Sequence, residues 1–153
     1  MKTLWFDLEE TIIDAFDKLP CLVNEDKIER ILNTIEHDRI GIFSFALWNE
    51  EDRTRFKTLI KPFLENRFNI TIDISLVPIK PELFKAISSH RKQKSGLCMD
   101  MMDFNDFWDK QQGFMDWIKI VHTGHNILID DLVEDCIMTF PTCTIQMINI
   151  KTF

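Results

Sequence analysis

Glycine and proline are scarce in this chain of 153 residues, which contains 4 Gly and 5 Pro. Low-complexity and disordered segments are commonly rich in these residues, so no part of the sequence is typical of either class. Hydrophobic residues make up 45% of the chain and include 13 Phe and 4 Trp, which is enough to build one packed core. We therefore expect a single domain over residues 1–153, without internal repeats.

Closely spaced cysteines are also missing. The four cysteines form no CxxC pair: Cys21, Cys98, Cys136 and Cys143. This spacing argues against a zinc site and against a secreted disulfide framework, and it fits a reducing compartment. The amino terminus lacks the basic start and long apolar run of a signal peptide, and no apolar stretch is long enough to span a membrane. We expect a cytoplasmic protein with no membrane partner.

The chain has few positive charges relative to negative ones: it contains 18 basic and 25 acidic residues, and its net charge is −7. Such a balance opposes nonspecific attraction to nucleic-acid phosphates and to anionic membranes. A nucleic-acid substrate is therefore not indicated by charge, although it stays open if a local basic entrance forms near Arg91 and Lys92. The oligomeric state is not determined by the sequence.

Strand-like and helix-like segments alternate along the chain. Apolar runs of strand length predict strands at 3–6, 40–47, 70–77, 126–129, 136–140 and 144–150. Capping residues followed by apolar stripes predict helices that begin near Asn24, Asn49, Pro81 and Asn105. Strands alternating with helices predict an α/β fold with a doubly wound, mainly parallel sheet.

Aromatic residues at helical spacing are expected to lie in the core, not to form a base-stacking platform. The stripe in the helix after Asn49 is Phe56, Leu59, Ile60 and Phe63. The stripe in the helix after Asn105 is Phe107, Trp108, Phe114, Trp117, Ile118 and Val121.

Polar residues follow three of the predicted strands. Asp7 follows the first, Ser44 lies within or at the end of the second, and Asp130 with Asp131 follows strand 126–129. In open α/β sheets, ligands bind at the carboxyl ends of the strands. Carboxylates there suit Mg²⁺, which prefers a few hard oxygen ligands and could orient a phosphate against a carboxylate nucleophile.

These segments resemble the motifs of the haloacid-dehalogenase-like (HAD) hydrolase superfamily, in the family's order and over nearly the whole chain. The segment LWFDLEETIID is similar to the opening motif, an apolar strand followed by Asp-x-Asp-x-Thr, with Asp7 as the nucleophile and Thr11 at the threonine. Ser44 in GIFSFA matches the second motif. The third motif is a lysine in the helix before the last motif, and Lys110 matches it.

The fourth motif, an apolar strand followed by paired acids, is matched by ILIDDLVED. The resemblance implies that Asp7, Asp130 and Asp131 hold Mg²⁺, together with the backbone carbonyl of Glu9. Asp135 is a further candidate in the same segment. Asp7 would form an aspartyl-phosphate, and Glu9 would act as general acid and base.

The resemblance also implies that Ser44, Lys110 and Thr11 bind the phosphoryl oxygens. Two alternatives stay open: Ser44 as a buried core hydroxyl and Lys110 as an exposed helix lysine, with Lys119 or Lys92 in its place.

The chain departs from the family pattern at Glu9, where the family has aspartate. Glutamate adds a methylene, and a displacement of about an ångström can cost on the order of a hundredfold in rate. The alternative function is therefore a catalytically weak or inactive binding or regulatory module. Glu10 replaces the usual glycine and resembles the DLDET form of capless members that act on phosphoproteins.

No segment is long enough to form a sizeable cap domain, so the expected site is open. The substrate class is a phosphomonoester, either a small molecule such as a nucleotide or a macromolecule such as a nucleic-acid end or a phosphoprotein. Phosphotransfer to an alcohol is a further alternative to hydrolysis.

Two other polar patterns have weaker functional interpretations. Acids recur every third residue at Asp100, Asp103, Asp106 and Asp109, which is typical of a solvated face. His122 and His125 in HTGH resemble a metal pair only superficially, because Gly124 places a turn between them.

Overall fold

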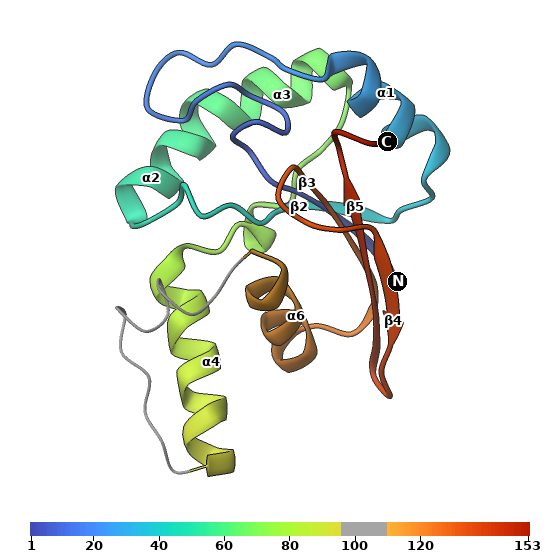
Figure 1. Ribbon diagram of the computed structural model, residues 1–153. Coiled ribbons are helices and arrows are strands. Elements are labelled where there is room, and N and C mark those ends of the chain that lie inside the picture. Colours follow the sequence, from blue (N-terminus) through green and yellow to red (C-terminus); the bar gives the residue numbers. More distant parts are fainter. Residues whose placement is uncertain (96–109) are drawn as a thin grey trace.

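The computed structural model describes residues 1–95 and 110–153 of the chain, and its centre is a five-stranded sheet (Figure 1). The strand order is β2-β1-β3-β5-β4. The bounds of the strands are β1 Lys2–Phe6, β2 Arg39–Ile42, β3 Gly124–Asp130, β4 Cys136–Thr139 and β5 Cys143–Asn149. All neighbours pair in parallel except β4 and β5, which are antiparallel. The predicted, mainly parallel sheet is confirmed.

Helices cover both faces of this sheet (Figure 1). On one side lie α1 (Glu25–Thr34), α2 (Glu50–Arg55) and α3 (Lys61–Phe68), and on the other lie α4 (Lys80–Ser95) and α6 (Lys110–Val121). Successive side chains of a strand point to opposite faces, so Leu4 and Phe6 pack toward the first group and Trp5 toward the second. The sheet is therefore doubly wound, as the alternation of segments predicted.

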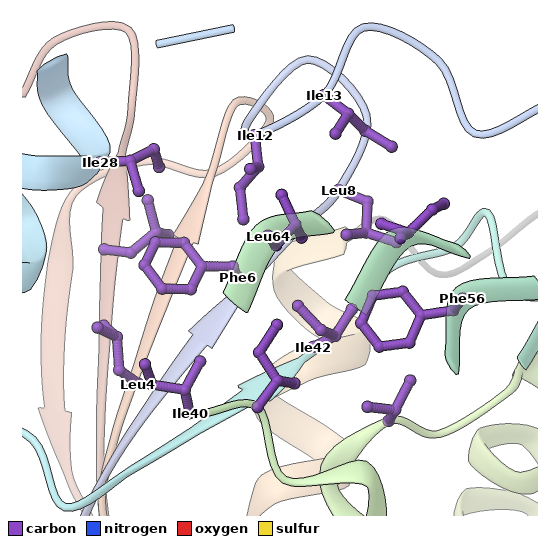
Figure 2. Close-up of a cluster of buried hydrophobic side chains, with 14 of the residues drawn as sticks. Leu4, Phe6, Leu8, Ile12, Ile13, Ile28, Ile40, Ile42, Phe56 and Leu64 are labelled. Atoms are coloured by element: carbon purple, nitrogen blue, oxygen red, sulfur yellow. The ribbon is translucent and has the colours of Figure 1, made fainter. Parts of the chain in front are cut away.

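The core under α1 and α3 also holds the loop that follows β1. Figure 2 shows Leu8, Ile12 and Ile13 of this loop beside strand residues of the sheet. All three are almost fully buried. Burying a side chain of this size contributes about 1.5–3 kcal/mol. The loop that carries Asp7 is therefore anchored by the core itself.

The opposite face is packed around Trp5. Its indole Nε1 donates to Asn126 Oδ1 at 3.0 Å, and its ring meets Trp117 edge-on at a centroid distance of 5.0 Å. Gly41 on β2 is required here, because a Cβ at this position would lie 2.7 Å from Leu76 Cβ and 2.8 Å from the Trp5 ring. A side chain on Gly41 would push β2 away from its neighbours.

The predicted strand at 70–77 is wrong. The segment makes one isolated parallel bridge, between Ile72 and Ile40, and then a 3-10 helix forms over Ile74–Leu76. Asp73 causes this turn, because its carboxylate accepts from Ser75 N at 3.0 Å and from Ser75 Oγ at 2.7 Å. Alternating apolar residues resembled a strand, but a local side-chain turn competed with pairing.

The predicted strand at 40–47 is too long, because β2 ends at Ile42. Phe43 donates to Phe6 O at 3.0 Å, and the chain then turns so that Ala46 N donates to Ser44 Oγ at 3.2 Å. The apolar run continues past the strand because Phe43 and Leu47 remain buried in the turn.

The helix after Asn49 forms as predicted, with the Asn49 side chain accepting from Asp52 N. Its apolar stripe is shifted: Leu64 is buried, whereas Phe63 is exposed to 39%. A π-helical turn over Phe56–Ile60 explains the shift, because each such turn inserts one extra residue and moves the buried position along by one. Phe56 and Ile60 are buried as expected.

Other helix ends differ in detail. Asn24 precedes α1, but its side chain does not cap that helix and instead donates to the carbonyls of Glu10 and Thr11. Val121 at the end of α6 is exposed to 49%. The predicted start at Asn105, and Phe107 with Trp108, lie outside the described residues. Within residues 1–95 and 110–153, no helix has both the length and the apolar character needed to span a bilayer.

Candidate active site

The carboxyl ends of β1 and β3 bring two aspartates together. The backbone amide of Asp7 donates to Ile129 O at 3.0 Å, so Asp7 continues the pairing of the two strands by one residue. Asp130 is the last residue of β3. The parallel register therefore places Asp7 and Asp130 at neighbouring strand ends, as the sequence predicted.

Lys110, at the start of helix α6, contacts both of these carboxylates. It is the first residue of α6, and its Nζ lies 2.7 Å from Asp7 Oδ1 and 3.0 Å from Asp130 Oδ2. The exposed fractions are 5% for Asp7, 6% for Lys110 and 0% for Asp130. Lys110 is thus a buried partner of both acids and not a surface lysine. Asp7, Lys110 and Asp130 are called the buried triad below.

Burial shapes the electrostatics of the buried triad. It raises the pKa of Asp7, and the nearby charge of Asp130 adds to this, although Lys110 opposes both. Burial likewise raises the pKa of Asp130. Burial disfavours the Lys110 ammonium, but the two carboxylates outweigh it and raise the pKa of Lys110. The cluster holds more negative charge than Lys110 offsets.

A third carboxylate stands beside the buried triad. One oxygen each of Asp7, Asp130 and Asp131 lie within 4.8 Å of one another. Asp130 Oδ1 accepts from Leu132 N at 2.9 Å, and its buried Oδ2 lies 3.0 Å from the Lys110 ammonium. Three clustered carboxylates beside this one ammonium fit a divalent cation with hard oxygen ligands. These are the three side-chain carboxylates that the sequence assigned to Mg²⁺.

Thr11 orients Asp7. Its hydroxyl donates to Asp7 Oδ2 at 3.2 Å, and its side chain is fully buried. A tight turn holds it there, because Leu8 O accepts from the amides of Thr11, Ile12 and Ile13. Contact between Thr11 and a phosphoryl group stays a prediction, since Thr11 is not among the residues that line the cavity described below.

Glu9 and Glu10 lie in the same turn. Glu9 is half-buried, and its Oε2 accepts from Phe16 N at 3.1 Å. Arg55 fixes that segment in turn, because its Nε donates to Phe16 O at 3.0 Å. Glu10 has a φ of 63°, a left-handed conformation that favours glycine. Glu10 therefore has a glycine-like backbone although it carries a side chain.

A cavity of about 310 Å³ opens above Asp7. Its polar lining comes from Asp7, Glu9, Glu10, Ser44, Lys110 and Asp131. Ser44 is 2% exposed, and its oxygen accepts from Ala46 N, which leaves the hydroxyl hydrogen to donate elsewhere. The structure thus brings Asp7, Asp131, the serine and the lysine around one cavity, whereas Asp130 is fully buried and does not line it.

Sequence reasoning missed the apolar residues that line this cavity, and it missed Lys80, which contacts two of them. Phe45, Ala46, Trp48 and Leu132 also line the cavity. Lys80 Nζ lies 3.6 Å from the centre of the Trp48 ring and 4.9 Å from that of Phe45. Burial, with the charge of Lys110, lowers the pKa of Lys80. No local signal in the sequence identifies Lys80, because the predicted strand before it does not form.

Several other candidates lie elsewhere. Lys119 is exposed, with its ammonium 4.9 Å from the centre of the Phe140 ring. Asp135 accepts from Asn149 N at 2.7 Å and so anchors a loop to β5. The side chains of Arg91 and Lys92, and the acids Asp100, Asp103, Asp106 and Asp109, lie outside the described residues.

The two histidines of HTGH have separate surroundings. His122 packs against Trp5 and Trp117, with ring centroids 5.1 and 4.7 Å away. His125 Nε2 lies 3.2 Å from Gln146 Oε1. Neither belongs to the carboxylate cluster at the carboxyl ends of the strands.

Comparison with known proteins adds no relative to this picture: no protein-family model matches the chain, and no curated protein or solved structure is significantly similar to it.

Proposed function

We propose that this protein is a small capless member of the HAD superfamily that hydrolyses a phosphomonoester through an aspartyl-phosphate, in a reducing cytoplasmic compartment. The observation that carries the proposal is the buried triad, in which Lys110 Nζ contacts Asp7 Oδ1 at 2.7 Å and Asp130 Oδ2 at 3.0 Å. Burying three charges is costly, so such a cluster at a cavity is a candidate for chemistry more than for stability.

Asp7 is the proposed nucleophile. Its carboxylate oxygen forms a bond to phosphorus while the bond between phosphorus and the leaving oxygen breaks, and the electron pair of that bond goes to the leaving oxygen. Thr11 orients Asp7 through the 3.2 Å hydrogen bond to Oδ2, and Lys110 holds Oδ1. Lys110 and the Ser44 hydroxyl face the same cavity and can hold the negative phosphoryl oxygens.

Glu9 is the proposed general acid and base. It protonates the leaving oxygen, then takes a proton from the water that attacks the aspartyl-phosphate, which releases inorganic phosphate and regenerates Asp7. Glu9 is among the residues that line the cavity, as this role requires. The same carboxylate accepts a hydrogen bond from Phe16 N, so Glu9 must work from a fixed loop.

Asp7, Asp130 and Asp131 would hold Mg²⁺, with the Glu9 carbonyl as a predicted further ligand. When bound, the cation would neutralise negative charge on the phosphoryl group. The closeness of the three carboxylates, within 4.8 Å of one another, and the raised pKa of Asp7 support this assignment.

The test is hydrolysis of a generic aryl phosphate with and without Mg²⁺. We expect Mg²⁺-dependent turnover that Asp7→Asn lowers by more than about a hundredfold, because the nucleophile is removed. Asp17→Asn, an exposed aspartate in the loop after β1, is the matched control and should keep its activity. An acid-stable phosphoenzyme, formed by the native protein and absent from Asp7→Asn, would identify the intermediate. Adding alcohol acceptors separates hydrolysis from phosphotransfer.

A second candidate function is a binding or regulatory module with little or no turnover. The hydrogen bond from Phe16 N to Glu9 favours it, because that bond ties the acid-base residue to its own loop. Glu9→Asp separates the two functions. A strong rise in turnover from an almost inactive native protein would support the module, whereas a fall would support Glu9 as the working acid.

A further inference from the structure

The wall of the cavity that sequence reasoning missed is apolar and largely aromatic. Phe45, Ala46, Trp48 and Leu132 form its apolar lining and share the cavity with the acids and Lys110. Trp48 is exposed to 48% and Leu132 to 72%, although large apolar side chains are usually buried. Isolated exposed apolar residues are ordinary, but these border the same cavity as the proposed nucleophile.

The two halves of this wall come from different strand ends on either side of Asp7. Phe45 and Trp48 follow β2, and Leu132 follows β3, while β1 runs between these strands and ends at Asp7. The leaving group of a substrate whose phosphoryl group lies beside Asp7 would therefore extend out of the cavity between Trp48 and Leu132. The cavity of about 310 Å³ is at the small end for ligand sites, which suits a phosphoryl group with a compact ring system.

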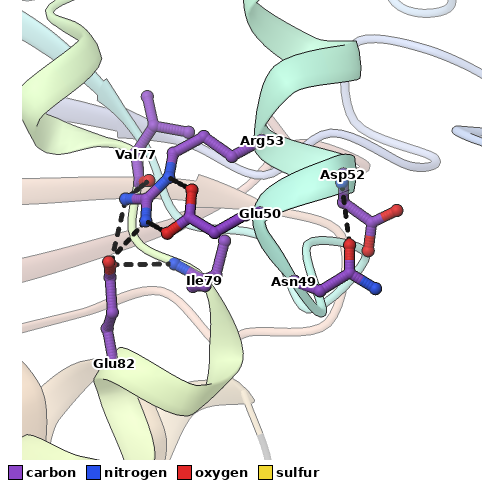
Figure 3. A network of polar contacts seen from close by, with 7 residues as sticks. All are labelled: Asn49, Glu50, Asp52, Arg53, Val77, Ile79 and Glu82. Carbon is purple, nitrogen blue, oxygen red and sulfur yellow. Dashed lines mark hydrogen bonds and ion pairs between the residues drawn. The ribbon is translucent and has the colours of Figure 1, made fainter.

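Backbone contacts fix the aromatic half of the wall. Trp48 N donates to Asp52 Oδ2 at 2.8 Å, and Lys80 N donates to Leu47 O at 2.9 Å. Arg53 of α2 pairs with Glu82 at the start of α4 and so links the two helices, and it also pairs with Glu50 of its own helix (Figure 3). A wall held in this way loses little conformational entropy when a ligand binds.

Lys80 restricts the charge of the ligand. Its ammonium lies over the Trp48 ring at 3.6 Å from the centroid and so already uses the attraction of that ring for cations. A cationic ligand would have to compete with Lys80 for the same ring. A neutral flat ring keeps the apolar and stacking contacts without that penalty.

We propose that Phe45, Trp48 and Leu132 form a subsite for a neutral, planar aromatic leaving group, so that the preferred substrates are phosphomonoesters carrying such a ring. This inference rests on the proposed function for the phosphoryl end of the ligand. The ring supplies binding that is the same before and during reaction, so the subsite lowers KM and leaves kcat nearly unchanged.

Binding of non-hydrolysable phosphonates tests the subsite without turnover. The probes are naphthylmethylphosphonate, the saturated decalinylmethylphosphonate and methylphosphonate, measured by calorimetry with Mg²⁺ present. We expect the naphthyl compound to bind about tenfold more tightly than the saturated one, and Trp48→Ala to remove this preference. Trp48→Phe should restore most of it. Ile137→Ala, an exposed apolar residue on β4, is the matched control and should change nothing.

Turnover gives the second measurement. With 2-phenylethyl phosphate, Trp48→Ala and Leu132→Ala should raise KM several-fold and leave kcat within about twofold. Phosphocholine, which carries a cation of similar size, should bind more weakly than 2-phenylethyl phosphate. Comparing O-phosphotyrosine with a nucleoside 5′-monophosphate then identifies the source of the ring, since both offer the same flat aromatic chemistry.

The outcomes separate the two proposals. Equal binding of naphthyl and saturated phosphonates, or a preference for phosphocholine, would overturn the subsite even if Mg²⁺-dependent hydrolysis is found. An aromatic preference that disappears in Trp48→Ala would support the subsite even if no phosphomonoester is hydrolysed, and in that case the hydrolase proposal alone would fail.

Discussion

Two clusters in this protein each join one basic residue to two carboxylates, yet they differ in burial. In the surface network of Figure 3, Arg53 pairs with Glu50 and Glu82 and also donates to Val77 O at 3.2 Å. In the buried triad, Lys110 pairs with Asp7 and Asp130, and all three side chains are almost fully buried. The two clusters combine the same charges, but we expect them to change the stability of the fold in opposite directions.

The difference is one of solvation. The Arg53 side chain is 22% exposed and its acids are more exposed, so water shares the charge, and the two acids raise the pKa of Arg53 through hydrogen bonds. Removing charges from water in the buried triad costs more than pairing returns, and the pKa of both aspartates rises. The surface network stabilises the fold, whereas the buried triad costs stability and is a candidate for function.

The largest effect is expected for Lys110→Met. Removing the ammonium leaves two buried carboxylates beside each other, so unfolding in urea at pH 7 without Mg²⁺ should show a loss of about 3 kcal/mol. Mg²⁺ should recover part of this loss by binding the folded state. Lys119→Met, at an exposed position of the same helix, is the control. Similar losses in the two variants would remove the distinction between buried and surface charge.

A smaller loss is expected for Arg53→Met. This change breaks the bonds to Glu50, Glu82 and the Val77 carbonyl, and we expect a loss of about 1–2 kcal/mol in the same urea experiment. Because the surface network is partly exposed, 1 M salt (a Debye length of about 3 Å) should reduce the effect of Arg53→Met but not that of Lys110→Met. Equal salt dependence would contradict the comparison.

Asp7→Asn should change stability in the opposite direction, with a gain of about 1 kcal/mol at pH 7 without Mg²⁺. The folded-state pKa of Asp7 is raised, so its destabilising charge is absent below the ordinary pKa and grows as pH rises through the folded value. The gain should therefore disappear as pH falls toward 4, as measured by urea unfolding across pH. A loss of stability at pH 7 would mean that the buried triad stabilises the fold.

His122 lies outside both clusters and should lower the stability of the fold at acid pH. Burial lowers its pKa to about 4, so the unfolded chain binds more protons between the ordinary value of 6.5 and that pH. The contribution of neutral His122 is fully present above pH 6.5 and is lost as pH falls toward 4, by on the order of 1 kcal/mol after allowance for partial exposure. His122→Phe should remove this part of the pH dependence in thermal unfolding.

The smallest effect is expected for Glu10→Gly. A glutamate at a φ of 63° is strained, and glycine should stabilise the protein by up to about 1 kcal/mol in urea unfolding. Glu25→Gly, within the regular helix α1, is the control and should destabilise instead. A loss of stability in both would indicate that Glu10 makes a compensating contact.

Much of the site was predictable because it lies directly after strands. Asp7, Ser44 and Asp130 could be assigned to one sheet edge from apolar runs that end in polar residues, and parallel strands bring such ends together. Lys110 was predicted only by the resemblance, since its distance from Asp7 in sequence gives no local signal. Its burial and its contact with both acids depend on how α6 packs against the sheet.

The errors arose where local interactions compete with the apolar pattern. Residues 70–77 alternate like a strand, but the Asp73 side chain forms a turn with Ser75. Phe63 has the spacing of a buried residue, but a π-helical turn buries Leu64 instead. Both changes follow from local hydrogen bonds, which the spacing of hydrophobic residues along the sequence does not reveal.

The sequence by itself determined the class of fold, the order of its main parallel strands along the chain and the acids at their ends, because periodicity and strand-end position are local properties. Only the tertiary structure decided that Thr11 orients Asp7, that Glu9 is tied to Phe16, and that Phe45, Trp48 and Leu132 share a cavity with Lys110. These relations depend on the packing of loops from different strands, and distances between such loops are not encoded in the spacing of residues along one segment.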